Sequence, residues 1–219
     1  MKIGTDGVLL GAWCPINEDV KSVLDIGAGT GIIALMIAQR SKAQQIDAIE
    51  IEENAFEECV KNFEKSPWSD RLYCYHAGID ELIDDPEDEY DIIVSNPPFY
   101  TDNNACLTES RTIARSENSL PFELLIEAAD LLLSEKGIFA VILPRKEEDS
   151  FINLCKESFL FPFEILRVKG SINSNEIRSL VAFKREISHV KINQLTIEIS
   201  RHKYTEEYKK IVEDFYLKM

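Results

Sequence analysis

The residues best able to do chemistry follow a short apolar run near the middle of the chain. Asp91 to Ser95 is typical of a strand, and residues 96–100 after it read Asn-Pro-Pro-Phe-Tyr. The Asn96 side-chain oxygen and the Pro97 carbonyl are two acceptors that can take both hydrogens of one planar amino group. The proline rings restrict the loop, and Phe99 and Tyr100 offer faces on which a base can stack. The motif predicts a site that draws an amino lone pair out of conjugation and directs it at an electrophile.

A second motif lies upstream, where a buried strand runs directly into a glycine-rich turn. Asp25 is followed by Gly27, Gly29 and Gly31 in the pattern Asp-x-Gly-x-Gly-x-Gly, and an apolar helical segment comes next. Glycines there let a ligand approach the main chain at the positive end of a helix. The dinucleotide fingerprint Gly-x-Gly-x-x-Gly would place its third glycine at position 32, which is isoleucine. A nicotinamide-dependent oxidoreductase is therefore a disfavoured alternative.

An acidic residue, Glu50, ends the next apolar run. A carboxylate at the end of a second strand can accept hydrogen bonds from both hydroxyls of a ribose. Dinucleotides and S-adenosylmethionine both carry such a ribose. Glu50 therefore supports a nucleoside-containing cofactor without choosing between these two.

The motifs lie in a repeating pattern of short apolar runs and longer segments with helical periodicity. The expected strands are Ser22 to Ile26, Gln45 to Glu50, Leu72 to His76, Asp91 to Ser95 and Gly137 to Leu143. The expected helices are Gly31 to Arg40, Glu53 to Lys65, Pro121 to Ser134 and Glu147 to Ser158. This alternation predicts an α/β fold with a doubly wound, mostly parallel seven-stranded sheet, which binds ligands at the carboxyl ends of its strands.

The last part of the chain has a different pattern. Phe161 to Val168 and Ser179 to Arg185 predict a C-terminal antiparallel hairpin that finishes the sheet. His189 to Ser200 alternates like a half-buried strand, and Thr205 is expected to cap a last helix. Because no linker or repeat separates these parts, we expect a single domain over residues 1–219, with an N-terminal segment at 1–21 and a C-terminal extension at 186–219.

The charge is strongly negative and unevenly distributed. The 24 Lys and Arg residues face 39 Asp and Glu, a net charge of −15. Residues 1–100 hold 7 basic and 20 acidic side chains, and residues 101–219 hold 17 and 19. This balance excludes tight nonspecific binding to nucleic acids or anionic membranes. It is compatible with a site-specific nucleic-acid enzyme, because the negative charge lies mainly in the half that carries the glycine motif.

The chain has no apolar run of membrane-spanning length and no recognisable secretory signal. Its 5 cysteines have no metal-ligand spacing. We therefore expect reduced thiols, a cytoplasmic location, no bound metal and no membrane partner. We also expect a monomer.

Together the two motifs resemble those of class I S-adenosylmethionine-dependent methyltransferases with a Rossmann-like fold. Asn-Pro-Pro-Phe is similar to the signature of N6-adenine, guanine-N2 and glutamine-N5 enzymes, so it leaves the acceptor open. Residues 1–13, Met-Lys-Ile-Gly-Thr-Asp-Gly-Val-Leu-Leu-Gly-Ala-Trp, resemble a stretch of the bacterial tRNA1(Val) (adenine(37)-N6)-methyltransferases. This similarity runs from Met1 to about Phe183. It implies methyl transfer from S-adenosyl-L-methionine to the N6 amino group of a tRNA adenine, adenine 37 of tRNA1(Val).

The resemblance also implies a set of site residues. The segment 1–21 would line the cofactor pocket, and the expected cofactor contacts are Thr5, Asp6, Asp25, Gly27, Gly29, Gly31, Glu50, Ile79 and Asn96. The expected catalytic residues are Asn96, Pro97 and Phe99, and the expected substrate contacts are Pro98, Phe99, Tyr100, Arg111 and Arg115.

Two of these assignments have open alternatives. Backbone around Ile79 is assigned to the cofactor adenine because position 78, where relatives carry an acid, is glycine; Asp80 is the alternative. Asp6 could instead belong to a turn before a helix, Val8 to Trp13, that packs on the sheet. Relatives usually carry further residues before this motif, so we expect this chain to bind the cofactor more weakly.

A tRNA substrate requires cations that contact phosphates. Arg111 and Arg115 are four residues apart, so one helix face near the acceptor pocket would hold both. The further candidates are Arg145, Lys146, Arg167, Lys169, Arg178, Lys184 and Arg185. An enzyme acting on rRNA guanine N2 or on a protein glutamine, and a non-catalytic cofactor-binding module, are the alternative functions.

Overall fold

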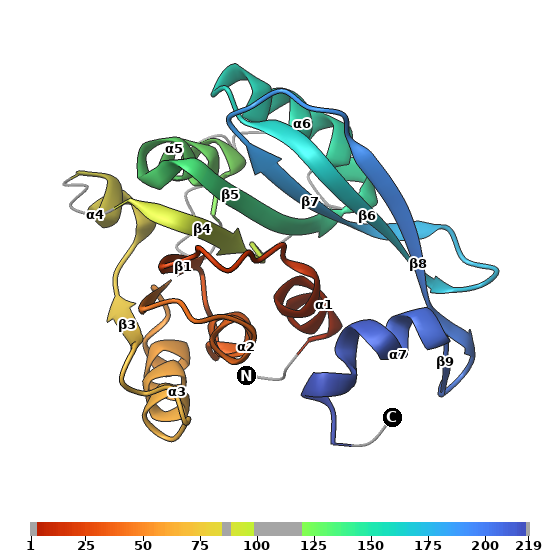
Figure 1. Ribbon diagram of the computed structural model, residues 1–219, viewed down its shortest axis with the longest axis horizontal. Coiled ribbons are helices and arrows are strands. Elements are labelled where there is room, and N and C mark those ends of the chain that lie inside the picture. Colours follow the sequence, from red (N-terminus) through yellow and green to blue (C-terminus); the bar gives the residue numbers. More distant parts are fainter. Residues whose placement is uncertain (1–3, 85–88, 99–119, 218–219) are drawn as a thin grey trace, which may run out of the picture.

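The computed structural model describes residues 4–84, 89–98 and 120–217, and its strands form one nine-stranded sheet (Figure 1). The strand order is β3-β2-β1-β4-β5-β7-β6-β8-β9. The strands are β1 (Ser22–Ile26), β2 (Gln45–Glu50), β3 (Leu72–His76), β4 (Tyr90–Ser95), β5 (Leu133–Pro144), β6 (Phe161–Ser171), β7 (Glu176–Lys184), β8 (Lys191–Ser200) and β9 (Lys203–Tyr204). Strands β1 to β5 pair in parallel, whereas β7 is antiparallel to both β5 and β6.

The expected fold class is confirmed, and the expected number of strands is wrong. The first five strands and the C-terminal hairpin lie where the apolar runs predict them. The extension adds two strands to these seven, because β8 pairs in parallel with β6 and β9 pairs with the end of β8. Residues 191–194 at the start of β8 are exposed, so the sequence pattern there is weaker than in the buried central strands.

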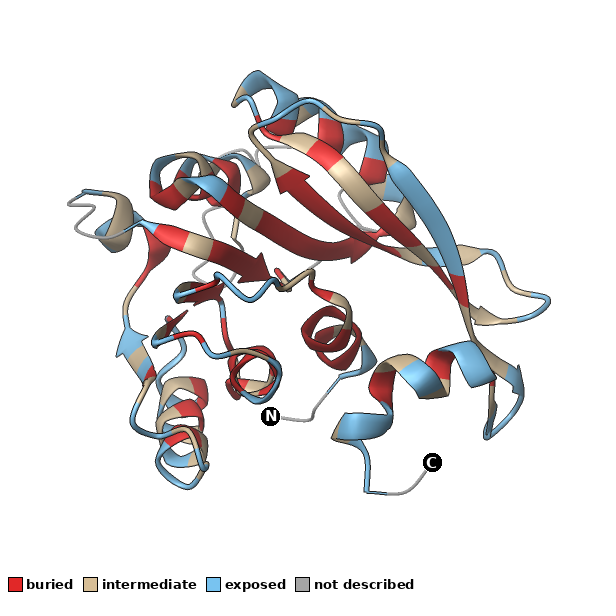
Figure 2. Ribbon diagram, viewed as in Figure 1, coloured by how far each residue is buried: buried red, intermediate tan, exposed pale blue. Residues whose placement is uncertain are grey.

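Helices cover both faces of the sheet (Figure 1). One layer holds α1 (Thr5–Trp13), α2 (Ile32–Arg40), α3 (Glu53–Glu64) and α7 (Glu206–Val212), which contribute to one buried apolar cluster. The other layer holds α4 (Ile79–Asp84), α5 (Phe122–Leu132) and α6 (Glu148–Glu157), which contribute to a second cluster. The 3-10 turns Arg145–Glu147 and Glu213–Phe215 precede α6 and follow α7. Central strands are buried on both faces (Figure 2), as parallel sheets require.

The first helix explains the apolar opening of the chain. In α1, residues Gly7 to Ala12 are all buried, because the helix lies in the core with no face toward water. Arg40, at the end of α2, donates to the Gly11 and Cys14 carbonyls at 2.7 and 3.0 Å. These bonds satisfy carbonyls at the carboxyl end of α1 that have no partner within the helix. Among the described residues, no helix combines the length and apolarity needed to cross a bilayer.

Candidate functional site

The glycine turn joins β1 to α2 and is held against the end of β2. Gly27, Gly29 and Gly31 have φ angles of +71, +58 and +77°. Residues that carry a Cβ rarely adopt such positive values. A Cβ at Gly31 would lie 2.5 Å from the Phe63 ring and 2.7 Å from the Cys59 sulfur. A Cβ at Gly27 would meet nothing within 4 Å. Gly31 is therefore required for packing, whereas the space beside Gly27 is open to a ligand.

Asp25, at the end of β1, is a buried carboxyl group with one unused acceptor. Its side chain is 0% exposed, and its Oδ2 accepts from the Ala34 N–H at 3.1 Å. Its Oδ1 is buried and has no hydrogen-bond partner among the residues that the structure describes. Burial raises the pKa of Asp25 to about 7, the Ala34 N–H lowers the pKa, and the negative charge of Glu50 raises it. A cationic ligand group beside this carboxyl would provide the missing interaction.

Glu50 joins the turn to the second strand. Its Oε2 accepts from the Gly29 N–H at 2.7 Å, and its Oε1 accepts from the Glu52 N–H at 2.9 Å. Each carboxylate oxygen has two acceptor positions, so both can still bind a ribose hydroxyl. The sequence analysis missed Ile51, which follows Glu50 and is 59% exposed. A large apolar residue after the strand-ending acid was the available signal, and Ile51 can cover the face of a nucleobase.

The Asn-Pro-Pro motif leaves β4 beside the glycine turn. Ser95 pairs with Ile26 in the sheet, and the Ser95 hydroxyl donates to the Ile26 carbonyl at 2.9 Å. Asn96 is half-buried, Pro97 is buried and Pro98 is exposed. Asn96 therefore begins the loop after β4 at the edge of the sheet where the loop after β1 begins. Phe99, Tyr100, Arg111 and Arg115 lie outside the described residues.

The first turn of α1 lies near Asn96 and the start of α2. A Cβ on Gly7 would lie 4.0 Å from the Asn96 Nδ2 atom and 3.3 Å from Ile32, the first residue of α2. Thr5 is exposed, and Asp6 forms an ion pair of 2.7 Å with Arg178 of β7. The segment is a buried helix, as the alternative interpretation expected, whereas contact of Thr5 and Asp6 with a cofactor stays a prediction. Nothing in the sequence pairs Asp6 with a residue 172 positions away.

The residues assigned to the adenine contact lie at the start of α4. The Gly78 N–H donates to the Glu81 side chain at 2.9 Å, which resembles a capping box. Ile79 is 6% exposed and packs in the core with α5. The Ile79 side chain is therefore turned away from solvent, and only its backbone could face a ligand. Asp80 is exposed.

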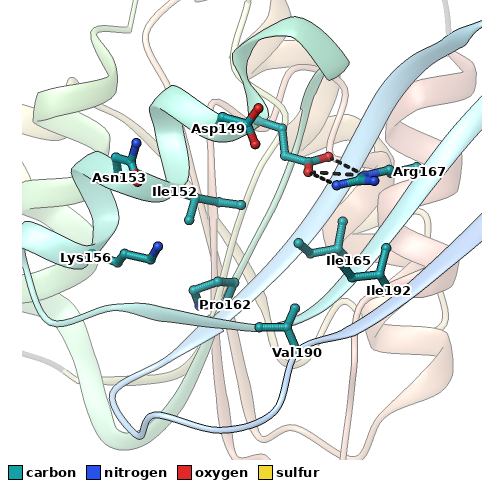
Figure 3. A pocket seen from close by; sticks show the side chains of 10 residues that line it. Asp149, Ile152, Asn153, Lys156, Pro162, Ile165, Arg167, Val190 and Ile192 are labelled. Carbon is teal, nitrogen blue, oxygen red and sulfur yellow. Dashed lines mark hydrogen bonds and ion pairs between the residues drawn. The ribbon is translucent and has the colours of Figure 1, made fainter.

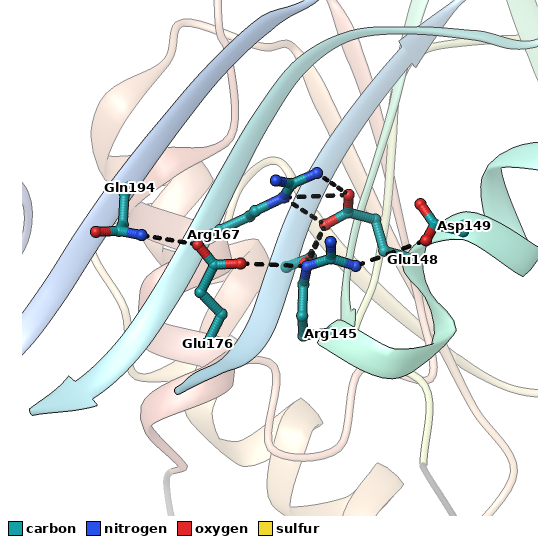
Figure 4. A network of polar contacts seen from close by, with 7 residues as sticks. Arg145, Glu148, Asp149, Arg167, Glu176 and Gln194 are labelled. Carbon is teal, nitrogen blue, oxygen red and sulfur yellow. Dashed lines mark hydrogen bonds and ion pairs between the residues drawn. The ribbon is translucent and has the colours of Figure 1, made fainter. Parts of the chain in front are cut away.

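The basic residues of the C-terminal half are mostly engaged within the protein. All the candidates from Arg145 to Arg185 except Lys169 form ion pairs with acidic side chains. Arg145 and Arg167 belong to a network around the buried Glu148 (Figure 4). The interpretation of these cations as phosphate ligands is therefore corrected for Arg167, which donates to both oxygens of Glu148. It is also corrected for Arg185, which donates to the Asp130 side chain and to the Asp130 and Leu133 carbonyls.

Two hollows lie among the described residues, and Thr30 of the glycine turn lines the second. One groove, of about 450 Å³, lies between α6 and strands β6 and β8 (Figure 3). The other, of about 440 Å³, lies between α2, α3 and the C-terminal turn. Neither is lined by Asn96, Asp25 or Glu50. Within the described ranges, no three His, Cys, Asp or Glu side chains are grouped to hold a metal.

These residues fit S-adenosyl-L-methionine. The unpartnered Asp25 Oδ1 suits an ammonium group, Glu50 suits a ribose, and the space beside Gly27 allows a ligand to approach the main chain. The start of α2 adds the positive end of a helix. The arrangement therefore has separate places for the charged end and the nucleoside end of the cofactor.

Comparison with known proteins gives the same family. Residues 13–150 match the model of the methyltransferase small domain. A tRNA1(Val) (adenine(37)-N6)-methyltransferase from Flavobacterium johnsoniae is 59% identical, over 100% of this chain and 94% of the relative. One from Christiangramia forsetii is 54% identical, and one from Proteus mirabilis is 38% identical over 99% of this chain and 88% of the relative.

Solved structures support the fold alone. A predicted O-methyltransferase from Agrobacterium tumefaciens superposes with a TM-score of 0.73 at 16% identity, over 95% of this chain and 96% of the other. A ribosomal protein L11 methylase from Lactobacillus delbrueckii gives a TM-score of 0.55 at 14% identity, over 82% and 78%. The sequence relatives are more specific than these structures, and the chain therefore belongs to the tRNA1(Val) (adenine(37)-N6)-methyltransferase family.

Proposed function

We propose that this protein transfers a methyl group from S-adenosyl-L-methionine to the N6 amino group of adenine 37 in tRNA1(Val). One observation carries the reaction type: Asn96 and Pro97 leave β4 directly beside the glycine turn that leaves β1. The amino-group acceptors and the cofactor residues therefore occupy adjacent strand ends. The names of relatives that match the whole chain support the substrate and its position.

In the proposed reaction, the residues of β1 and β2 hold the cofactor. Asp25 faces its ammonium group, Glu50 accepts from its ribose hydroxyls, and Ile51 covers its adenine. The bound cofactor supplies a methyl group on a positively charged sulfur. The turn glycines would allow it to lie close to the backbone.

Asn96 and Pro97 prepare the nucleophile. The Asn96 side-chain oxygen and the Pro97 carbonyl each accept one hydrogen of the N6 amino group. This pairing draws the nitrogen lone pair out of the adenine ring, and the proline backbone keeps the acceptors in place before substrate arrives. The nitrogen forms a bond to the methyl carbon as the carbon–sulfur bond breaks. The product nitrogen is a strong acid and releases its extra proton to water.

The experiment is transfer of labelled methyl to unmodified tRNA1(Val), followed by nucleoside analysis. We expect N6-methyladenosine in the wild-type transcript and no label in a transcript with guanosine at position 37. Label in rRNA as N2-methylguanosine, or in a protein glutamine, would overturn the substrate assignment. Absence of transfer to any of these with intact cofactor binding would favour the non-catalytic module.

Substitution of Asn96 tests the mechanism. We expect Asn96→Ala to lower the single-turnover rate by at least about 10²-fold, because one of two oriented acceptors is lost. Binding of S-adenosylhomocysteine, measured by calorimetry, should fall by much less than the rate, because Asp25 and Glu50 remain to hold the cofactor. The matched control is Asn193→Ala, since Asn193 is exposed on β8. A rate equal to that of the control would contradict the role of Asn96.

We also propose an oligomeric state and a location for the enzyme. It acts as a single-domain monomer in the cytoplasm, where its tRNA substrate is found. Light scattering at micromolar concentration checks the monomer, and a dimer mass would contradict it.

A further inference from the structure

Arg178 connects the C-terminal sheet to the helix that contacts Asn96. Its Nε atom donates to Asp6 Oδ2 at 2.7 Å, and the two side chains are 33% and 29% exposed. In β7, successive side chains point to opposite faces. Ser179 belongs to the Glu148 network on the α6 face, whereas Arg178 points to the face covered by α1. The ion pair therefore ties the amino end of α1 to the strand opposite the end of β5, where Arg178 pairs with Pro144.

The two ends of α1 are held in different ways. At the carboxyl end, the Arg40 guanidinium donates to two backbone carbonyls, those of Gly11 and Cys14. At the amino end, Gly4 makes no side-chain cap, and the first helical bond, from Val8 N–H to the Gly4 carbonyl, is long at 3.4 Å. In this turn Asp6 forms the ion pair with Arg178, and Gly7 and Val8 are buried in the core. A cap or ion pair at a helix end has its main effect on the first turn.

The position of this first turn matters because a side chain at Gly7 would reach the amide of Asn96. A Cβ at Gly7 would lie 4.0 Å from the Asn96 Nδ2 atom and 3.3 Å from Ile32. Movement of the turn would therefore change the space around the amide whose oxygen faces the acceptor amino group in the proposed reaction. Small displacements of an acceptor change reaction rates strongly.

We propose that Arg178 is a positioning residue for methyl transfer: through Asp6, it fixes the first turn of α1 and thereby the orientation of the Asn96 amide. This role rests on the proposed function, and it replaces the reading of Arg178 as a phosphate ligand. It also explains why an aspartate in the cofactor-lining segment is already neutralised by an arginine.

The primary test compares Arg178→Gln with Arg185→Gln. Arg185 follows the other end of β7 and forms an ion pair of the same length, 2.7 Å, with Asp130. Both variants lose one arginine next to β7, but only Arg178→Gln frees α1. At saturating tRNA and cofactor, we expect the single-turnover rate to fall about tenfold or more for Arg178→Gln and to stay near wild type for Arg185→Gln. Arg178→Lys should recover part of the rate, because it keeps the positive charge.

Two further measurements separate positioning from phosphate binding. The salt dependence of tRNA affinity should be unchanged in Arg178→Gln, whereas loss of a phosphate contact would lower the slope by about one. In an Asp6→Asn background, Arg178→Gln should cause no further loss of rate, because the pair is already broken. A reduced salt slope, or full additivity of the two substitutions, would overturn the proposal.

Hydrogen exchange tests the inference independently of the reaction. Amides of residues 8–10 should lose protection in Arg178→Gln and keep it in Arg185→Gln. If wild-type protein methylates no tRNA but this exchange difference is present, the proposed function fails while the anchoring of α1 stands. If the exchange of α1 is identical in both variants, the anchoring role fails whatever the activity.

Discussion

The cofactor side and the C-terminal sheet use their charged groups in different ways. Around the glycine turn, in the described part of the chain, Asp25 has a buried oxygen without a partner, and Glu50 accepts from the backbone N–H groups of Gly29 and Glu52. Beside the C-terminal strands, Glu148 at the start of α6 is 1% exposed and is surrounded by Arg145, Arg167 and the Ser179 hydroxyl (Figure 4). The carboxylates of the first region keep acceptor positions that a ligand can use, whereas the charges of the second region pair with one another.

This difference changes how the net charge is understood. The near-neutral C-terminal half suggested a surface that could receive tRNA phosphates. In the structure, its arginines instead join β6, β7 and the start of α6, and Glu176 extends the network to Gln194 of β8. The hydrogen bond from Gln194 is the largest cause that lowers the pKa of Glu176, followed by the bond from Arg145. A count of basic residues therefore overstates the surface available to RNA.

The largest expected effect is on the Glu148 network. Glu148→Ala should lower the free energy of unfolding by ~3–5 kcal/mol, because it leaves buried donors and two arginines without their carboxylate. Asp149→Ala is the control, since the Asp149 side chain is 84% exposed and 4.0 Å from Arg145. Urea unfolding measures both. Equal losses for the two variants would mean that Glu148 is not the centre of the network.

On the cofactor side, Glu50→Gln should mainly affect binding. The change removes a charged acceptor from the ribose and from Gly29, and we expect about 10- to 100-fold weaker binding of S-adenosylhomocysteine. Glu53→Gln, at an exposed position in the first turn of α3, is the matched control. Calorimetry gives both constants. A Glu50→Gln affinity within twofold of the control would contradict the ribose contact.

The raised pKa of Asp25 predicts a pH-dependent affinity. In the free protein the carboxyl is protonated below a pH of about 7, and a bound ammonium favours its ionised form. Binding therefore releases a proton, and affinity should rise by up to about tenfold per pH unit until pH 7 and then level off. Calorimetry with S-adenosylhomocysteine in two buffers of different ionisation enthalpy measures the proton.

The control for this behaviour is Asp25→Asn, which cannot titrate. Its affinity should lack the rise below pH 7. The sign for stability is opposite: a carboxyl whose pKa is raised on folding makes the free protein less stable as pH rises from about 4 to about 7. A wild-type affinity that is flat from pH 6 to 8 would show that Asp25 does not meet the ammonium group.

The smallest expected effect concerns Lys169, the candidate phosphate ligand that has no ion pair in the described part of the chain. Lys169→Ala should weaken tRNA binding a few-fold and reduce the salt slope by about one. Lys184→Ala is the control, because Lys184 pairs with Glu186 at the other end of the hairpin. If the control changes the slope equally, pairing within the protein does not decide which cations bind RNA.

The structural features that depend on residues close together in the sequence were predictable. The strand Ser22–Ile26, the glycine turn and the helix after it follow from an apolar run, three glycines and a helical period. The cap at Thr205 is also confirmed, since its side chain accepts from the Tyr208 N–H. Helix α4 and strand β9 were not predicted, because six and two residues give too little periodicity.

Long-range polar contacts were not predictable. Arg167 and Arg178 have the same residue type and lie on neighbouring strands, yet one binds the buried Glu148 and the other binds Asp6. The face of the sheet on which each arginine lies depends on strand register. The partner that it meets depends on which helix covers that face. Neither property is encoded in the spacing of charged residues along the chain.

The sequence by itself determined the chemistry of this protein. Its alternating apolar and helical segments predict the α/β sheet, and its two motifs predict a cofactor turn and a pair of amino-group acceptors, because backbone geometry and hydrogen bonding at each motif depend on adjacent residues. Tertiary structure decided which charges remain free for ligands. Pairing of a charged side chain depends on burial and on distances between elements far apart in the chain, and these exist only once the sheet has formed.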